Sequence, residues 1–297
     1  MSRLLLTLIF SLLVQLPALS QAQQDTSSPP AALVGRLWSP ASAHFMPLEA
    51  LYQRLPEGGW LLIGEQHDNP DHHRLEAEII TALGQRQQLG AVALEMANGD
   101  QQPLLDQTLD AALPPTPEAL NWSAGWPWAL YEAPLQAAFR WSSRVLGADL
   151  TPAQIRTAHA EGAPQGELEP AQGDFMAELL FHSHCGQLPR SQLEPMRQVQ
   201  LARDQQIAAV LRAHSLPGRT GVLLTGSIHA RRDLGVPRWL DSTAHLTLLL
   251  VAVEPDAVSP EDYLPESFGN LPTTDLVLFT PARKTPDYCA EFSKSQP

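Results

Sequence analysis

Acidic and imidazole side chains follow three short apolar segments of this chain, residues 60–63, 91–94 and 222–224. These side chains are Glu65, His67, Glu95 and His229. Two imidazoles with one or two carboxylates suit a divalent metal ion that keeps one position open for water. One functional hypothesis is therefore a divalent-metal-dependent hydrolase, either a protease or an esterase. Its metal ligands would be Glu65, His67 and His229. Its general base would be Glu95.

The three apolar segments are typical of strands in a parallel sheet. They lack polar alternation, which indicates strands that are buried on both faces. Residues 246–253 and 276–279 extend the set to a sheet of about five or six strands. In open α/β sheets, ligands bind at the carboxyl ends of the strands. We therefore expect the four acidic and imidazole side chains to share one crevice, although they lie far apart in the sequence.

Helices are expected between the strands. Asn69-Pro70 and Thr151-Pro152 each place proline directly after a residue type that caps helices. A long helix is expected over residues 193–213, and a Trp-rich helical insertion over residues 122–144. Residues 162–173 are rich in Gly, Pro and acid, which favours an exposed linker or loop. The predicted fold class is α/β, with a mostly parallel sheet flanked by helices and a helical insertion.

The N-terminus has the pattern of a secretory signal peptide, because a short positive start precedes an apolar run and then small residues. The predicted division of the chain is a signal peptide over residues 1–22, a flexible leader over 23–33, a folded domain over 34–289 and a C-terminal tail over 290–297. The predicted location is the periplasm. No cysteine lies near the cleavage point, so a lipid anchor is not supported.

Charge excludes one class of partner. The 297 residues carry a formal net charge of −13, with 44% hydrophobic residues, enough for a sizeable core. A non-specific nucleic-acid binder needs a basic face to neutralise phosphates, and the sequence shows none. We therefore expect no nucleic-acid partner.

The two cysteines, Cys185 and Cys289, both follow the predicted signal peptide. An oxidising compartment permits a disulfide between them, which would close a loop of about a hundred residues. We predict this disulfide. The alternative is a metal-ligating thiolate beside His182 and His184.

Several motifs, in the same order, resemble the ChaN group of haem-binding uptake proteins, which belongs to the Tiki/TraB-like superfamily. The matching segments are Gly64-Glu65-Gln66-His67-Asp68 with His72-His73, Leu94-Glu95-Met96, Trp126-Pro127-Trp128 through Tyr131 and Pro134, Gln200-x-x-Arg203-Asp204, and Gly226-Ser227-Ile228-His229-Ala230-Arg231-Arg232-Asp233 with Gly235-Val236-Pro237. The resemblance covers about residues 34–289, and the segment after His229 is its most specific part.

The resemblance implies an exported protein that binds haem during iron acquisition, as a dimer that sandwiches two haems with tyrosine as the iron ligand. It also implies an outer-membrane haem receptor as a partner. Tyr131 lies inside a matching segment and is the first candidate for that tyrosine. A core aromatic residue is the alternative role for Tyr131. On this hypothesis the protein is not an enzyme.

Haem requires an apolar slot, an axial ligand and partners for two propionates. An aromatic cluster could wall such a slot, or could simply be core: Trp122, Trp126, Trp128, Tyr131, Phe139 and Trp141. Arg231 and Arg232 could pair with propionates, and surface salt bridges are the alternative. The predicted haem-binding residues are Glu65, His67, Glu95, Tyr131, His229, Arg231 and Arg232. A third hypothesis is that the acids and imidazoles are the remnant of a site in a protein that only scaffolds partners.

Overall fold

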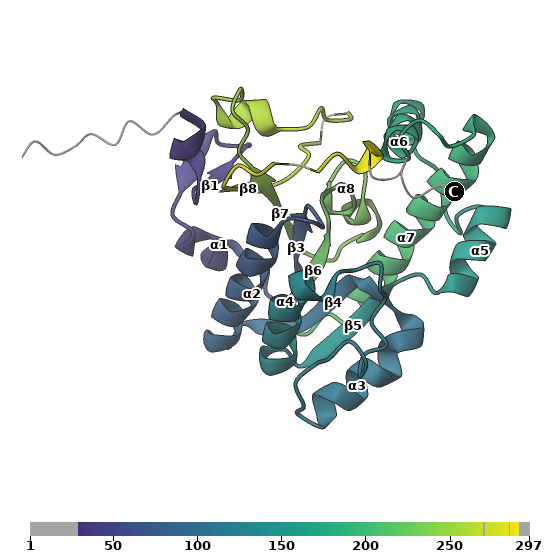
Figure 1. Cartoon of the computed structure of the whole chain (residues 1–297). Coiled ribbons are helices and arrows are strands. Elements are labelled where there is room, and N and C mark those ends of the chain that lie inside the picture. The colour runs from purple at the N-terminus through teal and green to yellow at the C-terminus, as the bar shows by residue number, and fades with distance from the viewer. Residues whose placement is uncertain (1–28, 270, 285, 291–297) are drawn as a thin grey trace, which may run out of the picture.

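A mixed sheet of eight strands forms the centre of the fold (Figure 1). The structure is a computed structural model that describes residues 29–269, 271–284 and 286–290. The strands are β1 (Leu37–Ser39), β2 (His44–Met46), β3 (Trp60–Glu65), β4 (Leu89–Asn98), β5 (Arg144–Asp149), β6 (Thr220–Gly226), β7 (His245–Ala252) and β8 (Leu276–Thr280). Their order across the sheet is β2-β1-β8-β7-β3-β6-β4-β5.

The sheet is parallel from β8 to β5, and the short strands β1 and β2 form an antiparallel hairpin at its other edge. The α/β class and the mostly parallel sheet are confirmed, whereas the expectation of five or six strands is too low. The hairpin strands have three residues each, which is too short for a periodic signal. The segment of β5 contains Gly147 and Asp149, residue types that are depleted in strands.

Helices cover both faces of the sheet. They are α1 (Glu49–Arg54), α2 (Pro70–Gln85), α3 (Gln102–Asp110), α4 (Trp128–Trp141), α5 (Pro152–Glu161), α6 (Pro170–Ser183), α7 (Leu193–Ala213) and α8 (Ser227–Ala230). Alternate strand residues pack against opposite layers. Leu61 and Ile63 of β3 pack in a core with α1, α2 and α4, whereas Leu62 packs in a core with α7. The parallel strands are therefore buried on both faces, as their sequences predict.

Local capping explains where two helices begin. The Asn69 side chain accepts a hydrogen bond from the Asp71 backbone N–H, and Pro70 occupies the first turn of α2. The Thr151 side chain accepts one from the Gln154 backbone N–H at the start of α5. Both predicted helix starts are confirmed.

Two other segments differ from expectation. The Trp-rich stretch is helical only from Trp128, because the chain turns before Pro127, and it ends in β5 rather than in more helix. The predicted linker over residues 162–173 is shorter, since α6 begins at Pro170. Its Leu168 is buried against α6 and α7, which anchors the loop.

The ends of the folded domain also have defined contacts. Residues 29–33 of the predicted leader form a short 3-10 helix, and Leu33 is buried beside Trp38 and Phe279. The predicted signal peptide over residues 1–22 and most of the predicted tail lie outside the described residues. Within the described part, we find no helix both long enough and apolar enough to cross a membrane.

The C-terminal segment crosses the top of the molecule from β8 towards α6, in yellow in Figure 1. Cys289 of this segment forms a disulfide with Cys185, which follows α6, over a sequence separation of 104 residues. The predicted disulfide is confirmed. Because Cys185 is bonded to Cys289, it is not a thiolate metal ligand beside His182 and His184.

Candidate functional site

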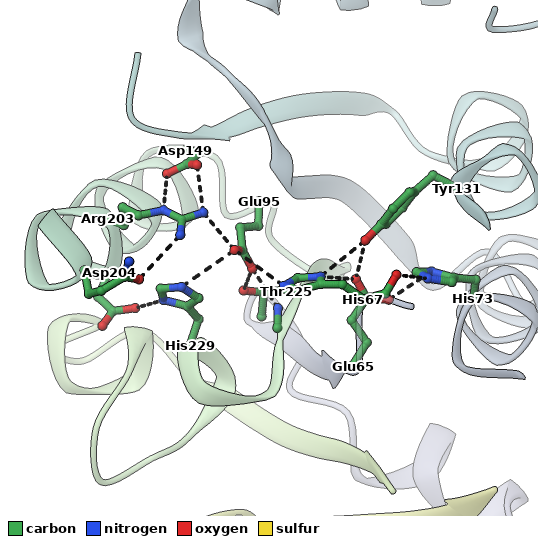
Figure 2. A network of polar contacts seen from close by, with 12 residues as sticks. Glu65, His67, His73, Glu95, Tyr131, Asp149, Arg203, Asp204, Thr225 and His229 are labelled. Carbon is green, nitrogen blue, oxygen red and sulfur yellow. Dashed lines mark hydrogen bonds and ion pairs between the residues drawn. The ribbon is translucent and has the colours of Figure 1, made fainter. Parts of the chain in front are cut away.

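Three neighbouring strands bring the predicted acids and imidazoles together at their carboxyl ends (Figure 2). Glu65 ends β3 and is level with Gly226, which ends β6, while Glu95 lies on β4 on the other side of β6. Immediately after β6 the chain turns into α8, which carries His229. Gly64 permits this close approach, because a Cβ at that position would lie 2.8 Å from the Ala230 Cβ.

Glu95 is the centre of one half of the network. Its carboxylate accepts hydrogen bonds from the Thr225 hydroxyl at 2.6 Å, the Gly226 backbone N–H at 2.7 Å and the Arg203 guanidinium at 2.8 Å. Burial alone would raise the pKa of Glu95, but the positive charges of His229 and Arg203 hold that pKa well below its usual range. Glu95 is therefore an ionised, fully bonded carboxylate, and these contacts oppose a role as a general base.

Arg203 and His229 complete this half. Arg203 makes two hydrogen bonds of 2.9 Å to the Asp149 carboxylate in addition to its bond to Glu95. His229 lies 2.7 Å from Asp204 through Nδ1 and 3.6 Å from Glu95 through Nε2. Burial would lower the pKa of His229, but the charges of Glu95 and Asp204 raise it. Both ring nitrogens of His229 thus face carboxylates of the chain itself.

Glu65 is the centre of the other half. Its Oε1 atom accepts a hydrogen bond from the Tyr131 hydroxyl at 3.0 Å and lies 2.9 Å from His67 Nδ1. Its Oε2 atom lies 2.9 Å from His73 Nδ1. Burial alone would raise the pKa of Glu65, but contacts with His67 and His73 lower it. Two imidazoles and a phenol therefore surround the carboxylate of Glu65, whereas Arg203 and His229 provide the positive charge beside Glu95.

His73 connects Glu65 to a second buried carboxylate, Glu76. The His73 Nδ1 atom lies 3.1 Å from Glu76 Oε2, and its Nε2 atom lies 3.0 Å from the His67 carbonyl oxygen. Burial and the neighbouring charge of Glu65 raise the pKa of Glu76 to about 8. Burial would lower the pKa of His73, but hydrogen bonds to Glu65 and Glu76 raise it to about 10.

His67 is the most accessible imidazole of the cluster. Its side chain is 36% exposed, against 8% for His229 and 2% for His73. The Trp126 ring lies 4.8 Å from the His67 ring, centroid to centroid. The Nε2 atom of His67 lies 3.9 Å from Glu95, beyond hydrogen-bond distance. The structure therefore presents one imidazole, oriented by a buried carboxylate, at the surface of the site.

Tyr131 does not lie at the surface. It is 1% exposed, and its hydroxyl is directed at Glu65 and His67. Burial, with the charge of Glu65, raises the pKa of Tyr131 far above its usual range. Phenolate formation at this position is therefore strongly opposed, and the alternative role of a core aromatic residue describes Tyr131 better than that of an exposed iron ligand.

The predicted arginine pair is also committed elsewhere. Arg231 is 1% exposed and forms two hydrogen bonds, of 2.9 and 2.7 Å, to the Asp233 carboxylate. Arg232 pairs with Asp275. The expectation that both arginines face the propionates of haem did not allow for pairing with acids of the chain itself. Asp233, two residues after Arg231, was the signal in the sequence for such a pairing.

The metal ligand set of the hydrolase hypothesis is not gathered in one place. In the described ranges, the acid and imidazole atoms that come within 4.8 Å of one another as a possible metal site belong to Glu65, His73 and Glu76. His229 is held on the far side of Glu95 by Asp204. Glu65, His67, Glu95 and His229 do lie close together, and their charges are arranged as two linked ion-pair networks.

Several site residues were not predicted as such: Glu76, His73, Asp149, Arg203, Asp204, Thr225 and Arg283. His73, Arg203 and Asp204 lie within motifs that carry the family resemblance, so the motifs themselves were a signal. Glu76 could be found from its spacing, because it lies one helical turn after His73 on α2. Arg283 pairs with Asp68 at 2.8 Å, and no local pattern indicates this contact across the sequence.

The protein is of the α/β class. Its mostly parallel sheet carries a network of imidazoles and carboxylates at the carboxyl ends of the strands. The family model for haem-binding uptake proteins of the Tiki superfamily, ChaN, matches residues 51–240, and the chain belongs to this family. The match contains both halves of the network. It confirms the family that the sequence motifs indicate.

Among solved structures, one has a similar fold over most of its length and others have lower similarity. The structure described as cofacial haem binding to ChaN of Campylobacter jejuni has 22% sequence identity and a TM-score of 0.66, and the alignment covers 82% of this chain and 95% of that one. A Bacillus cereus protein has 9% identity and a TM-score of 0.42, covering 69% and 68%. The erythromycin esterase EreC has 14% identity and a TM-score of 0.43, covering 69% and 72%. No curated protein gives a significant match.

Proposed function

We propose that this protein binds haem at the surface around the end of β3 and takes part in haem uptake or trafficking. The match to the haem-binding uptake family over residues 51–240 carries this proposal. The similarity to the fold of the C. jejuni ChaN structure, which binds haem cofacially, supports it.

Two surface groups near the end of β3 can donate to a haem iron. One is His67, whose Nδ1 atom is oriented by Glu65 and whose Nε2 atom makes no close contact with Glu95. The other is Tyr288, which is 48% exposed and donates a hydrogen bond to the carboxylate of Asp68, the residue after His67. Asp68 could accept the phenolic proton when Tyr288 binds iron. Imidazole and phenolate are both axial ligands of haem.

Two further groups that haem can use lie nearby. The half-buried Trp126 ring beside His67 offers a flat apolar surface. Arg283, which pairs with Asp68, is a cation that a propionate can reach, because its side chain is 22% exposed. Arg231, in contrast, is almost entirely buried. Arg232 is more exposed, at 29%, but it pairs with Asp275 rather than with a residue beside His67. The propionate partner proposed is therefore Arg283, because its partner Asp68 directly follows His67.

The test is a haemin titration of the purified protein, followed through the Soret band, with His67→Ala, Tyr288→Phe and Tyr131→Phe variants. We expect saturable binding that weakens at least about tenfold in one of the two surface variants, whose identity names the iron ligand. Tyr131→Phe should retain saturable binding, because the Tyr131 hydroxyl is buried against Glu65 and His67 rather than facing haem. Loss of binding in folded Tyr131→Phe would favour Tyr131 as the iron ligand instead. Absence of saturable binding in the wild-type protein would overturn the proposal. Full affinity in a His67→Ala/Tyr288→Phe double variant would show that haem binds elsewhere.

Export, a dimer around haem and a receptor partner are part of the same proposal. The signal-peptide pattern of residues 1–22 motivates export to the periplasm. A flat apolar ligand shared between two copies would link dimerisation to haem, so we expect the mass in solution to double when haemin is added. A mass that stays constant through saturation would contradict the shared-ligand dimer and leave haem binding itself intact.

A further inference from the structure

We propose that Glu65, His73 and Glu76 form a buried site for a single first-row divalent metal ion such as Zn²⁺. This site lies behind the proposed haem surface and shares Glu65 with it, because Glu65 also orients His67. It differs from the Glu65, His67 and His229 set of the hydrolase hypothesis. Glu65 comes from the end of β3, and the other two residues come from successive turns of α2. The proposal does not depend on whether the protein binds haem.

The three side chains already converge. One possible ligand atom from each lies within 4.8 Å of the others, and His73 Nδ1 lies 2.9 Å from Glu65 Oε2 and 3.1 Å from Glu76 Oε2. Ligand atoms about 2 Å from a tetrahedral zinc are separated by roughly 3.3 Å. The two distances from His73 to the carboxylates would therefore need to lengthen by only a few tenths of an ångström around a metal ion.

Two oxygen atoms of this cluster lack a hydrogen-bond partner although they are fully buried: Glu65 Oε2 and Glu76 Oε1. The contact between His73 Nδ1 and Glu65 Oε2 is short, but its alignment fits an ion pair rather than a hydrogen bond. An N–H at Nδ1 is instead aligned with Glu76 Oε2. Buried carboxylate oxygens without a donor are strongly disfavoured. In the empty site a proton shared between Glu76 and Glu65 would relieve this, and a bound cation would take the place of that proton and satisfy both oxygens.

Neighbouring groups hold the ligands in the orientation that a metal site requires. The Nε2–H of His73 is directed at the His67 carbonyl oxygen at 3.0 Å, which leaves Nδ1 to face the carboxylates. The Tyr131 hydroxyl donates to Glu65 Oε1, the oxygen on the side away from His73. A backbone carbonyl behind a metal-binding histidine and a donor behind a metal-binding carboxylate are the usual supports of such ligands.

Charge and ligand chemistry define the class of ion. Two carboxylates balance a divalent cation, so the loaded site is neutral when His73 contributes a neutral imidazole. One nitrogen and two oxygen ligands suit zinc and its neighbours better than the all-oxygen preference of calcium or magnesium. A monovalent ion would leave one buried negative charge uncompensated, which is costly at this depth.

The site lies beside the groove between α2 and α4, which lie side by side in Figure 1. His73 lines a cavity of about 440 Å³ there, together with Pro70, Ala77, Ala129 and Leu130. Because the His73 side chain is only 2% exposed and Glu65 and Glu76 are fully buried, an ion entering from this cavity would have to displace the His73 ring to reach the carboxylates.

The test uses the full protein after removal of bound metals with a chelator, titrated with Zn²⁺ against a chromophoric chelator. We expect one equivalent of tight binding, weakened at least about tenfold by Glu76→Gln. Glu49→Gln, at an exposed acid on α1, is the matched control and should bind like the wild-type protein. Circular dichroism establishes that each variant is folded.

Crystals of the wild-type protein soaked in Zn²⁺ give an independent measurement, because zinc can be located by its anomalous scattering. We expect a peak between Glu65, His73 and Glu76. A peak only at surface histidines, or no stoichiometric binding by the wild-type protein, would overturn the proposal even if Glu76→Gln fails to fold. Equal affinity in folded Glu76→Gln and wild-type proteins would overturn it as well.

Discussion

The two halves of the polar network use the same acidic residue types but neutralise them differently. Around Glu95, the compensating charge comes mainly from Arg203 and His229, with Arg203 also bonded to Asp149. Around Glu65 and Glu76, it comes from His67 and His73. A guanidinium keeps its proton at any physiological pH, whereas an imidazole can lose it.

This difference teaches that one half keeps a permanently charged guanidinium beside its carboxylates, whereas the other half relies on imidazoles alone and can exchange its cation. The Glu95 half is suited to holding β4, β6 and α7 together. The Glu65 half can be neutral through protons or through a metal ion, and it reaches the surface at His67. We therefore expect ligand binding at the histidine half, around Glu65, His67, His73 and Glu76. We expect the arginine half, around Glu95 and Arg203, to contribute mainly to stability.

The largest expected effect breaks the arginine half. Arg203→Met leaves Glu95 and Asp149 without their guanidinium in a buried setting, and we expect a loss of about 3–5 kcal/mol in the free energy of unfolding. Urea unfolding followed by circular dichroism measures it.

Arg197→Met is the control on the same helix, because Arg197 pairs with exposed Glu194 and Glu167. The Arg197 side chain is 13% exposed, but its two carboxylate partners are 50% and 60% exposed and stay hydrated without it, so a loss of at most about 1 kcal/mol is expected. Similar losses in the two variants would show that burial does not distinguish these ion pairs.

The second prediction concerns the pH dependence of the histidine half. Because the pKa of Glu76 is raised in the folded protein from 4.5 to about 8, the folded state binds more protons than the unfolded state in this window. The contribution of Glu76 to stability is therefore complete below pH 4.5 and is lost as the pH rises through about 8.

Glu76→Gln should remove this loss. The free energy of unfolding of the variant should therefore rise relative to that of the wild-type protein by about 1.4 kcal/mol per pH unit between roughly pH 5 and pH 8. Urea unfolding at several pH values, with a chelator present, measures the difference. Glu49→Gln should keep the wild-type profile. A constant difference between Glu76→Gln and wild type at all pH values would contradict the raised pKa.

The smallest effect compares one hydroxyl in each half. Tyr131→Phe removes a donor from Glu65, and Thr225→Val removes one from Glu95. We expect Tyr131→Phe to destabilise by about 2 kcal/mol and Thr225→Val by about 1 kcal/mol, because Glu95 keeps its bonds from Arg203 and the Gly226 N–H. Thermal and urea unfolding of the two variants decide the order. The reverse order would mean that the guanidinium does not protect Glu95.

Much of the backbone could be predicted from the sequence, because its signals are local. Apolar runs without polar alternation predicted the central strands, and Asn69-Pro70 and Thr151-Pro152 predicted two helix starts. Strand β5 was missed because Gly147 resembles a turn residue, whereas the structure needs glycine there: a Cβ would lie 2.3 Å from the Asn98 backbone oxygen. That contact joins residues from different strands, and a local pattern does not contain it.

The sequence alone determined the fold class, the disulfide between Cys185 and Cys289, and the meeting of Glu65, His67, Glu95 and His229 at one edge of the sheet. The four residues meet because parallel strands bring their carboxyl ends to the same edge, wherever the strands occur in the chain. Only the tertiary structure decided which acid pairs with which base. It buried Arg231 against Asp233, assigned Arg203 to Glu95 and placed Glu76 beside His73, because burial and charge pairing depend on contacts between segments that are distant in sequence.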